Sequence, residues 1–265
     1  MSEDAFLDLP AHRLRYRIDG AADDARAPWL VFSNSLGTDI GMWAPQAAAL
    51  AGPFRVLRMD ARGHGGSTAA PPPYSLADLG GDVLALMDAL GIARAHFCGL
   101  SIGGLTGQWL GVHAGDRFDR IVVCATAAKI GTAESWEARI AAVRDGGLAQ
   151  LTGATAERWF TPGFQDAQEA LVAGILDTFA AVDPAGYTGC CAALAGADLR
   201  ADIARIANPL LAISGDDDPV CTPADLQFIA DGVKAGRHVS LPGRHIVNLE
   251  SAQAFNAELL GFLAC

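Results

Sequence analysis

The stretch His96-Phe97-Cys98-Gly99-Leu100-Ser101-Ile102-Gly103-Gly104 indicates the fold of the whole chain. It contains the pattern G-x-S-x-G, preceded by an apolar, strand-like run and followed by the helix-like run Leu105–Val112. A serine between two such elements sits on a sharp strand-to-helix turn, which exposes its hydroxyl above a sheet. Gly99 and Gly103 suit this turn, because neighbouring backbone comes close and leaves no room for a Cβ atom. We therefore predict that Ser101 is a nucleophile.

The composition is that of a compact α/β enzyme. A chain of 265 residues suits one large domain with an inserted lobe, and 51% hydrophobic residues is too apolar for a disordered protein. With 19 Lys and Arg against 30 Asp and Glu, the net charge is −11. A nucleic-acid partner is therefore not expected, because phosphate binding needs clustered basic residues. An acidic protein with an anionic substrate must offer that substrate a local positive group.

The cysteines and the apolar runs bear on the compartment. The spacing of the six cysteines indicates neither a disulfide framework nor a metal site; they are Cys98, Cys124, Cys190, Cys191, Cys221 and Cys265. The N-terminus lacks the basic region and apolar core of a signal peptide. No apolar run approaches the ~20 residues that span a bilayer. We expect a reduced, cytoplasmic protein with no membrane partner and no metal.

Strand-like and helix-like runs alternate along most of the chain, which predicts an α/β fold with a mostly parallel sheet flanked by helices. A hairpin over residues 5–18 and a polar turn from Gly20 to Pro28 come first. Besides the strand into Ser101, the expected strands are Trp29–Phe32, Phe54–Met59, Ile121–Cys124, Pro209–Ser214 and His238–Leu241. Besides Leu105–Val112, the expected helices are Met42–Leu50, one that starts at the capping-box-like Ser75-Leu76-Ala77-Asp78, and Ser251–Leu263.

The alternation breaks between residues 127 and 205, where no strong strand run occurs. This segment predicts only helices, namely Ala133–Asp145, Ala154–Trp159, Gln165–Ala181 and Pro184–Ala195. A helical insertion between two strands of a sheet is best explained as a cap. We expect a core of residues 1–126 and 206–265 and a helical cap of residues 127–205.

A nucleophilic serine needs a base to take its proton and an acid to orient that base. Where the serine lies on a strand-to-helix turn of this kind, the three residues follow along the chain in the order Ser, Asp, His. The sequence supplies Gly215-Asp216-Asp217-Asp218-Pro219 and Pro242-Gly243-Arg244-His245, each directly after an expected strand. His245 is the predicted base. Asp218 is the predicted acid, because Pro219 stiffens the chain after it, and Asp217 is the alternative. His64, in a glycine-rich loop, is interpreted as loop structure.

Acyl transfer also needs hydrogen-bond donors for the negative oxygen that forms in the transition state. One is expected to be the backbone N–H of Ile102, the residue after the nucleophile. The other should come from the loop after Trp29–Phe32, where Ser35 is the best candidate through its backbone N–H.

Together these motifs resemble the α/β-hydrolase superfamily. They are S-N-S-L-G at 33–37, D-A-R-G-H-G-G-S at 60–67, G-L-S-I-G-G at 99–104, G-D-D-D-P at 215–219 and G-R-H at 243–245. The superfamily pattern places the acid third after the glycine, which again favours Asp218. A serine at position 101 argues against haloalkane dehalogenases and epoxide hydrolases, which carry Asp there.

A narrower resemblance rests on Ser33-Asn34, where many relatives carry His-Gly, and on the expected cap. There S-W-E-A-R-I at 135–140, E-R-W-F-T at 157–161 and G-C-C-A at 189–192 resemble the 3-oxoadipate enol-lactonases of bacterial aromatic catabolism. The resemblance implies hydrolysis of 3-oxoadipate enol-lactone to 3-oxoadipate through an acyl-enzyme. It also implies that no cofactor or metal is required.

This lactone carries a free carboxylate, for which Trp136 and Arg139 are the candidate binding residues. They stand three apart on one face of an expected helix and can line one pocket. The alternatives are a solvated or ion-paired Arg139 and a Trp136 in the core of the cap.

Two other enzyme functions use the same triad and cap: a broad carboxylesterase, and a hydrolase of C–C bonds in ring-fission products. A third possibility is a receptor that binds a small lactone and signals through a protein partner. The sequence does not indicate an oligomeric state.

Overall fold

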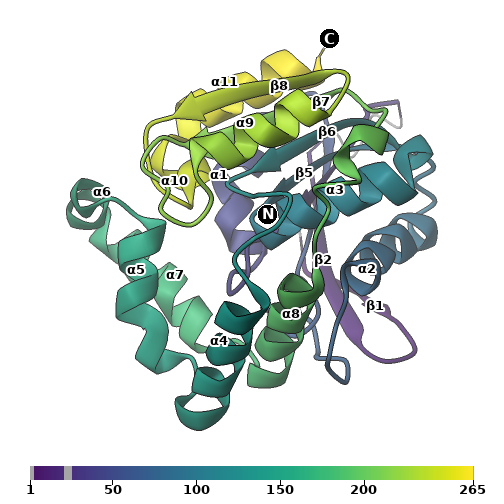
Figure 1. Ribbon diagram of the computed structural model, residues 1–265. Helices are drawn as coiled ribbons and strands as arrows, with labels where there is room; N and C mark the ends of the chain where they lie inside the picture. The colour runs from purple at the N-terminus through teal and green to yellow at the C-terminus, as the bar shows by residue number, and fades with distance from the viewer. Residues whose placement is uncertain (1–2, 21–25, 265) are drawn as a thin grey trace.

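The computed structural model describes residues 3–20 and 26–264 (Figure 1). The expected polar turn from Gly20 to Pro28 falls largely on residues outside this part of the chain, as does Cys265. The described residues form one sheet in the order β1-β2-β4-β3-β5-β6-β7-β8. Its strands are β1 (Ala5–Asp8), β2 (Arg13–Asp19), β3 (Trp29–Ser33), β4 (Arg55–Met59), β5 (Ala95–Leu100), β6 (Phe118–Cys124), β7 (Leu210–Gly215) and β8 (Gly236–Leu241).

The sheet is mostly parallel, as predicted. Strands β1 and β2 form the expected antiparallel hairpin, and β2 also pairs antiparallel with β4. Every other pairing is parallel. All six residues of β5 are buried, because helices cover both faces of a parallel sheet. The strand that leads into Ser101 therefore runs through the middle of the core.

In the described residues, six α-helices flank the sheet. They are α1 (Ala44–Leu50), α2 (Leu76–Ala89), α3 (Ile102–His113), α9 (Pro223–Gly232), α10 (Val247–Glu250) and α11 (Ala252–Leu263). The predicted start of α2 is confirmed, because the Ser75 side chain accepts from the Asp78 N–H while Asp78 accepts from the Ser75 N–H. In the described residues, no helix has both the length and the apolar character to cross a membrane.

A second group of helices follows β6 and precedes β7 in the sequence, and it lies beside the sheet (Figure 1). Its members are α4 (Ala133–Gly146), α5 (Thr152–Trp159), α6 (Pro162–Ala167), α7 (Glu169–Ala180) and α8 (Pro184–Gly196). Helix α4 packs on α8, and α5 packs on α7.

The single helix predicted over Gln165–Ala181 is wrong. The chain forms α6 and α7, which meet at Gln168, whose backbone angles of φ −129° and ψ 37° lie outside the helical region. Helix α6 starts earlier than expected because Thr161 caps it and Pro162 occupies its first turn. Helix α9 was not predicted, although Thr222, Pro223 and Asp225 form a capping box with proline at the start.

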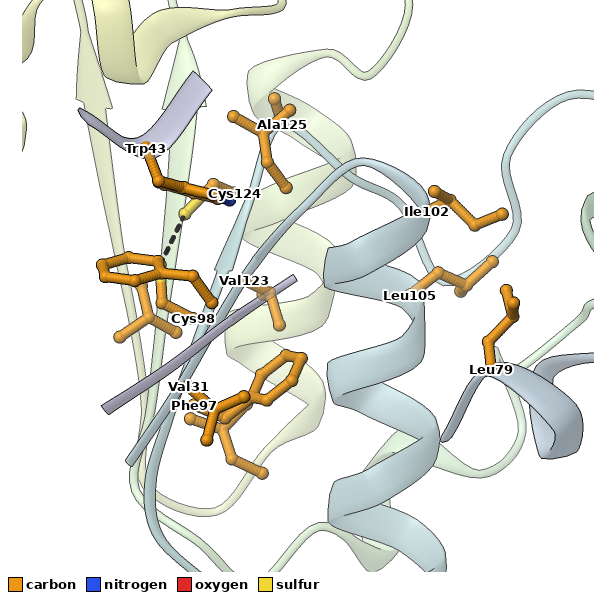
Figure 2. Packing of buried hydrophobic residues seen from close by; sticks show 14 of the residues in the cluster. Val31, Trp43, Leu79, Phe97, Cys98, Ile102, Leu105, Val123, Cys124 and Ala125 are labelled. Carbon is orange, nitrogen blue, oxygen red and sulfur yellow. Dashed lines mark hydrogen bonds between the residues drawn. The ribbon is translucent and has the colours of Figure 1, made fainter. Parts of the chain in front are cut away.

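The core fixes α3 against the sheet. Figure 2 shows this helix between Phe97 and Val123 of the sheet on one side and Leu79 of α2 on the other. Phe97 and Val123 are fully buried, and burying a side chain of this size contributes roughly 1.5–3 kcal/mol. The free thiols of Cys98 and Cys124 lie on the opposite face of the sheet, toward Trp43, with their sulfur atoms 3.9 Å apart. The N-terminus of α3, directly after Ser101, is therefore held in place from both sides.

Candidate active site

Ser101 sits on a strained turn between β5 and α3. Its backbone angles are φ 58° and ψ −117°, a conformation that costs a non-glycine residue about 1–3 kcal/mol. Two hydrogen bonds hold it there: the Ser101 N–H donates to the Cys124 carbonyl at 2.9 Å, and the Thr126 hydroxyl donates to the Ser101 carbonyl at 2.8 Å. The residue is 6% exposed.

The two glycines that flank the serine are required by close backbone contacts, as the sequence predicted. A Cβ atom on Gly99 would lie 2.2 Å from the Gly103 carbonyl oxygen. A Cβ atom on Gly103 would lie 2.4 Å from the carbonyl oxygen of Ser33. The turn at Ser101 is thus packed directly on the end of β3.

His245 is paired with Asp218. The His245 Nδ1 lies 2.9 Å from Asp218 Oδ2, and the two residues are 2% and 4% exposed. A carboxylate accepts only, so Nδ1 carries the hydrogen and leaves Nε2 unprotonated in the neutral ring. The other oxygen, Asp218 Oδ1, accepts from the backbone N–H groups of Val220 at 2.7 Å and Cys221 at 3.2 Å. Both oxygens of this buried carboxylate are therefore satisfied.

The neighbouring acids have other partners. Asp217 pairs with the Arg244 guanidinium at 2.9 Å, and its side chain is 63% exposed. Asp216 accepts from the Gly243 N–H at 3.0 Å. Of the three consecutive acids, only Asp218 contacts His245.

One cavity, of about 90 Å³, brings together Ser101, His245, Ser35, Trp136 and Arg139. Trp136 is half-buried, and its indole N–H donates to the Ile130 carbonyl at 2.6 Å. That bond fixes the ring at the wall of the cavity. The ring packs against the core and also lines the cavity, so a role of Trp136 in substrate binding stays a prediction.

The two expected oxyanion donors, the N–H groups of Ile102 and Ser35, differ in whether they already have a hydrogen-bond partner. Ile102 opens α3, and the first N–H groups of a helix have no partner within it. The Ser35 N–H instead donates to the Met42 sulfur at 3.4 Å, and a thioether is a weak acceptor. The following residue, Leu36, also lines the cavity.

Sequence reasoning missed Arg158, on α5. This residue lines the same cavity, and with Arg139 it also lines a wider cleft outside it. Five residues line both spaces: Ile130, Trp136, Arg139, Arg158 and Val220. Within the described part of the chain, neither arginine forms an ion pair. A signal was present in the stretch Glu157-Arg158-Trp159, but nothing in it shows which way Arg158 faces.

Charge from both arginines reaches the interior of the cavity. Burial raises the pKa of Tyr187, which lines the cavity, while the positive charges of Arg139 and Arg158 act in the opposite direction. The wall continues through edge-to-face contacts from Tyr187 to Phe179, with ring centroids 5.8 Å apart, and from Phe179 to Trp159 at 5.6 Å. The cavity is therefore apolar along one wall and positive at its mouth.

In the described residues, no cluster of three or more His, Cys, Asp or Glu side chains could hold a metal ion. The chemical groups of the site are the serine, the histidine–aspartate pair, backbone donors and two arginines.

Residues 28–252 match the model of a family described as the alpha/beta hydrolase fold. The chain belongs to this family. The chain is also similar to two named proteins of Acinetobacter baylyi. It is 45% identical to 3-oxoadipate enol-lactonase 2 over 92% of this chain and 90% of that protein. It is 43% identical to 3-oxoadipate enol-lactonase 1 over 89% of each chain.

The chain is also similar to a solved structure over nearly its whole length. The crystal structure of the enol-lactonase from Burkholderia xenovorans LB400 superposes with a TM-score of 0.96 at 46% identity, covering 98% of this chain and all of the other. The similarity therefore extends through the helices between β6 and β7 as well as the sheet.

Proposed function

We propose that this α/β-hydrolase opens 3-oxoadipate enol-lactone to 3-oxoadipate in the catabolism of aromatic compounds. The observation that carries the proposal is one cavity lined by Ser101, by His245 of the buried His245–Asp218 pair, and by two arginines that form no ion pair within the described residues. The similarity to proteins named 3-oxoadipate enol-lactonase supports the choice of substrate. Residues 127–205 act as a cap on a core formed by residues 1–126 and 206–265.

In the first step His245 takes the proton of Ser101, whose oxygen attacks the lactone carbonyl. Asp218 holds the ring so that Nε2 is the basic atom and stabilises the imidazolium that forms. The oxyanion accepts from the N–H groups of Ile102 and Ser35. A charge-assisted hydrogen bond is stronger than one to a neutral acceptor, so the oxyanion displaces the Met42 sulfur from the Ser35 N–H.

Collapse of this intermediate breaks the ring C–O bond and gives an acyl-enzyme. The leaving oxygen is an enolate, a better leaving group than an alkoxide, and it receives its proton from His245 or from water. Because that oxygen stays tethered to the acyl group, it competes with water for the acyl carbon. Tautomerisation of the enol to the ketone removes this internal nucleophile. Water activated by His245 then attacks the ester, and release of Ser101 completes the turnover.

The free carboxylate of the lactone lies toward the mouth of the cavity, on Arg139 and Arg158. The guanidinium groups offer several donors in a planar fork that matches a carboxylate. Trp136, fixed by its bond to Ile130, supplies a flat apolar surface for the ring. In a protein of net charge −11, two arginines at the mouth give the anionic substrate a local positive site.

A comparison of three substrates tests this function. Steady-state rates are measured on 3-oxoadipate enol-lactone, p-nitrophenyl acetate and a vinylogous 1,5-diketone. The proposal expects the enol-lactone to have the highest kcat/KM. A higher value on the acetate would favour a broad carboxylesterase, and a higher value on the diketone would favour a C–C bond hydrolase. Absence of multiple turnovers on any of them would favour a lactone receptor.

The buried thiols of Cys98, Cys124, Cys190, Cys191 and Cys221 are free. We also propose a cytoplasmic location, which suits reduced cysteines and an intracellular catabolic reaction.

A further inference from the structure

A second, smaller cavity lies behind the loop that carries Ser35. It has about 20 Å³ of space for the centre of a water molecule, and one water needs at least roughly 10–15 Å³ by this measure. Its lining comes from five segments: Asn34 and Ser35 after β3, His64 in the loop after β4, Asp82 on α2, Ile102 at the start of α3, and Cys190 on α8. The cavity therefore lies where the expected cap, the sheet and the candidate oxyanion loop meet.

Asn34 presents an acceptor without a donor. Its Nδ2 lies 3.4 Å from Asp60 Oδ1, and because a carboxylate only accepts, this contact fixes which end of the amide carries the hydrogens. The opposite atom, Asn34 Oδ1, is buried and contacts no donor among the described residues. The residue as a whole is 2% exposed.

His64 presents a second acceptor without a donor. Its Nδ1 lies 3.2 Å from the Arg62 carbonyl oxygen, so Nδ1 carries the hydrogen. Burial lowers the pKa of His64 to about 4, so the ring is neutral near pH 7 and Nε2 is unprotonated. This Nε2 is buried and has no donor in the part of the chain that the structure describes, and the residue is 1% exposed.

The ligand that fits must donate two hydrogen bonds, be neutral and have the size of one water molecule. A cation is disfavoured, because Asp82, the carboxylate that lines the cavity, already binds Arg62 at 2.7 Å and His12 at 3.1 Å. Leaving two buried acceptors without donors is unfavourable. The lone pairs of a water that donates to both remain free to accept from the Cys190 thiol, whose pKa is raised by burial.

We propose that this cavity binds one ordered water, which donates to both His64 Nε2 and Asn34 Oδ1. Through this water His64 holds the Asn34 side chain, and His64 is thereby a positioning residue for the oxyanion donor. The inference rests on the role proposed above for the Ser35 N–H. That N–H belongs to the peptide between Asn34 and Ser35. Asp60 holds one end of the Asn34 amide and the water holds the other, so the peptide is fixed in one orientation.

The Asp60 end of this arrangement is built into the fold. The Asp60 carboxylate binds the Arg15 guanidinium at 2.5 Å and accepts from the N–H groups of Ile40 at 2.7 Å and Gly66 at 2.9 Å. It thereby ties the loop of residues 33–40 to the loop of residues 60–67. The water adds a second tie between the same two loops, on the side that faces the nucleophile's helix.

A high-resolution crystal structure of the wild-type protein tests the binding site directly. We expect one water within about 2.7–3.2 Å of both Asn34 Oδ1 and His64 Nε2. A dry cavity, or a protein donor in contact with these two atoms, would overturn the proposal.

Two His64 variants test the positioning role. His64→Gln places an amide oxygen near the position of Nε2 and retains an acceptor, whereas His64→Leu has a similar size and offers none. With p-nitrophenyl acetate as the probe, we expect His64→Leu to lower kcat about 10-fold or more with KM unchanged, since a whole oxyanion donor is worth about 10²–10³ in rate. His64→Gln should restore most of kcat. Equal kcat in the two variants, or a loss found only in KM, would overturn the role.

This pair of measurements is independent of the natural substrate. If the enol-lactone is not hydrolysed but acetate release responds to His64 as expected, the substrate proposal fails and the water site stands. The reverse pattern, with efficient lactone turnover and no response to His64, removes only the water's role.

Discussion

His245 Nδ1 contacts Asp218 Oδ2 at 2.9 Å inside the protein, while Asp217, one residue earlier, pairs with Arg244 at the surface. Two adjacent carboxylates of the same chemistry thus have opposite surroundings. The difference follows from the turn after β7, which places the two backbone donors of Val220 and Cys221 on Asp218. Because of this difference, the same substitution at Asp217 and at Asp218 should have different effects on activity.

Asp218→Asn should lower kcat by on the order of 10³- to 10⁴-fold, because an amide opposite Nδ1 favours the wrong histidine tautomer. Asp217→Asn is the control. It removes an exposed ion pair worth about 0–1 kcal/mol, and kcat should stay within a factor of about two. Steady-state kinetics on a chromogenic ester measures both. A large loss in Asp217→Asn with an active Asp218→Asn would reverse the assignment.

The two arginines at the mouth of the cavity should act on anionic substrates alone. A hydrogen bond to a charged group contributes about 1.5–3 kcal/mol, so Arg139→Ala and Arg158→Ala should each raise KM for the enol-lactone about 10- to 100-fold. KM for a neutral ester should change little. Arg144→Ala, on the exposed side of α4 and outside both cavities, is the control. Equal shifts on anionic and neutral substrates would contradict carboxylate binding.

A methyl group at Gly103 should disrupt the turn. Its Cβ would meet Ser33 backbone at 2.4 Å, and backbone at that distance must move. We expect Gly103→Ala to lose about 2 kcal/mol or more in the free energy of unfolding, within the range for overpacked sites. Gly81→Ala, also in a helix but with open space around it, should gain about 0.5–1 kcal/mol. Urea titration of both variants gives the comparison, and a neutral Gly103→Ala would show that the contact is not rigid.

His64 should make the protein less stable in mild acid. Its pKa falls from 6.5 to about 4 on folding, so the unfolded chain binds a proton between these values that the folded chain does not. Stability is therefore fully present above pH 6.5 and falls as the pH drops toward 4, by about 3 kcal/mol in all. The difference in unfolding free energy between wild type and His64→Gln, taken at pH 7 and at pH 4.5, isolates this effect. Burial raises the pKa of Asp60 to about 6 and acts in the opposite direction, but Asp60 is present in both proteins. A constant difference across this range would show that His64 is protonated in the folded state.

Much of the fold followed from local sequence. The turn at Ser101 was predictable because the close backbone contact that requires glycine, between Gly99 and Gly103, lies within five residues of sequence. The buried strands and the start of α2 at Ser75 were predictable for the same reason, since period and capping are local properties.

What the sequence did not reveal depends on contacts between distant segments. The break at Gln168 and the direction of Arg158 depend on how α5, α6 and α7 pack, which no periodicity records. His64 looked like an ordinary loop residue, because its relation to Asn34 exists only once two loops, 30 positions apart in the chain, close on one cavity. The Ser35 N–H, which was expected to donate to the oxyanion, is bonded to the Met42 sulfur, a side-chain contact that composition does not show.

The most direct measurement is the steady-state rate on 3-oxoadipate enol-lactone for wild type and for Ser101→Ala. We predict efficient turnover by the wild type and a loss of several orders of magnitude in kcat for the variant, because removing the nucleophile of a triad leaves only binding and oxyanion stabilisation. Turnover by Ser101→Ala near the wild-type rate would contradict this prediction.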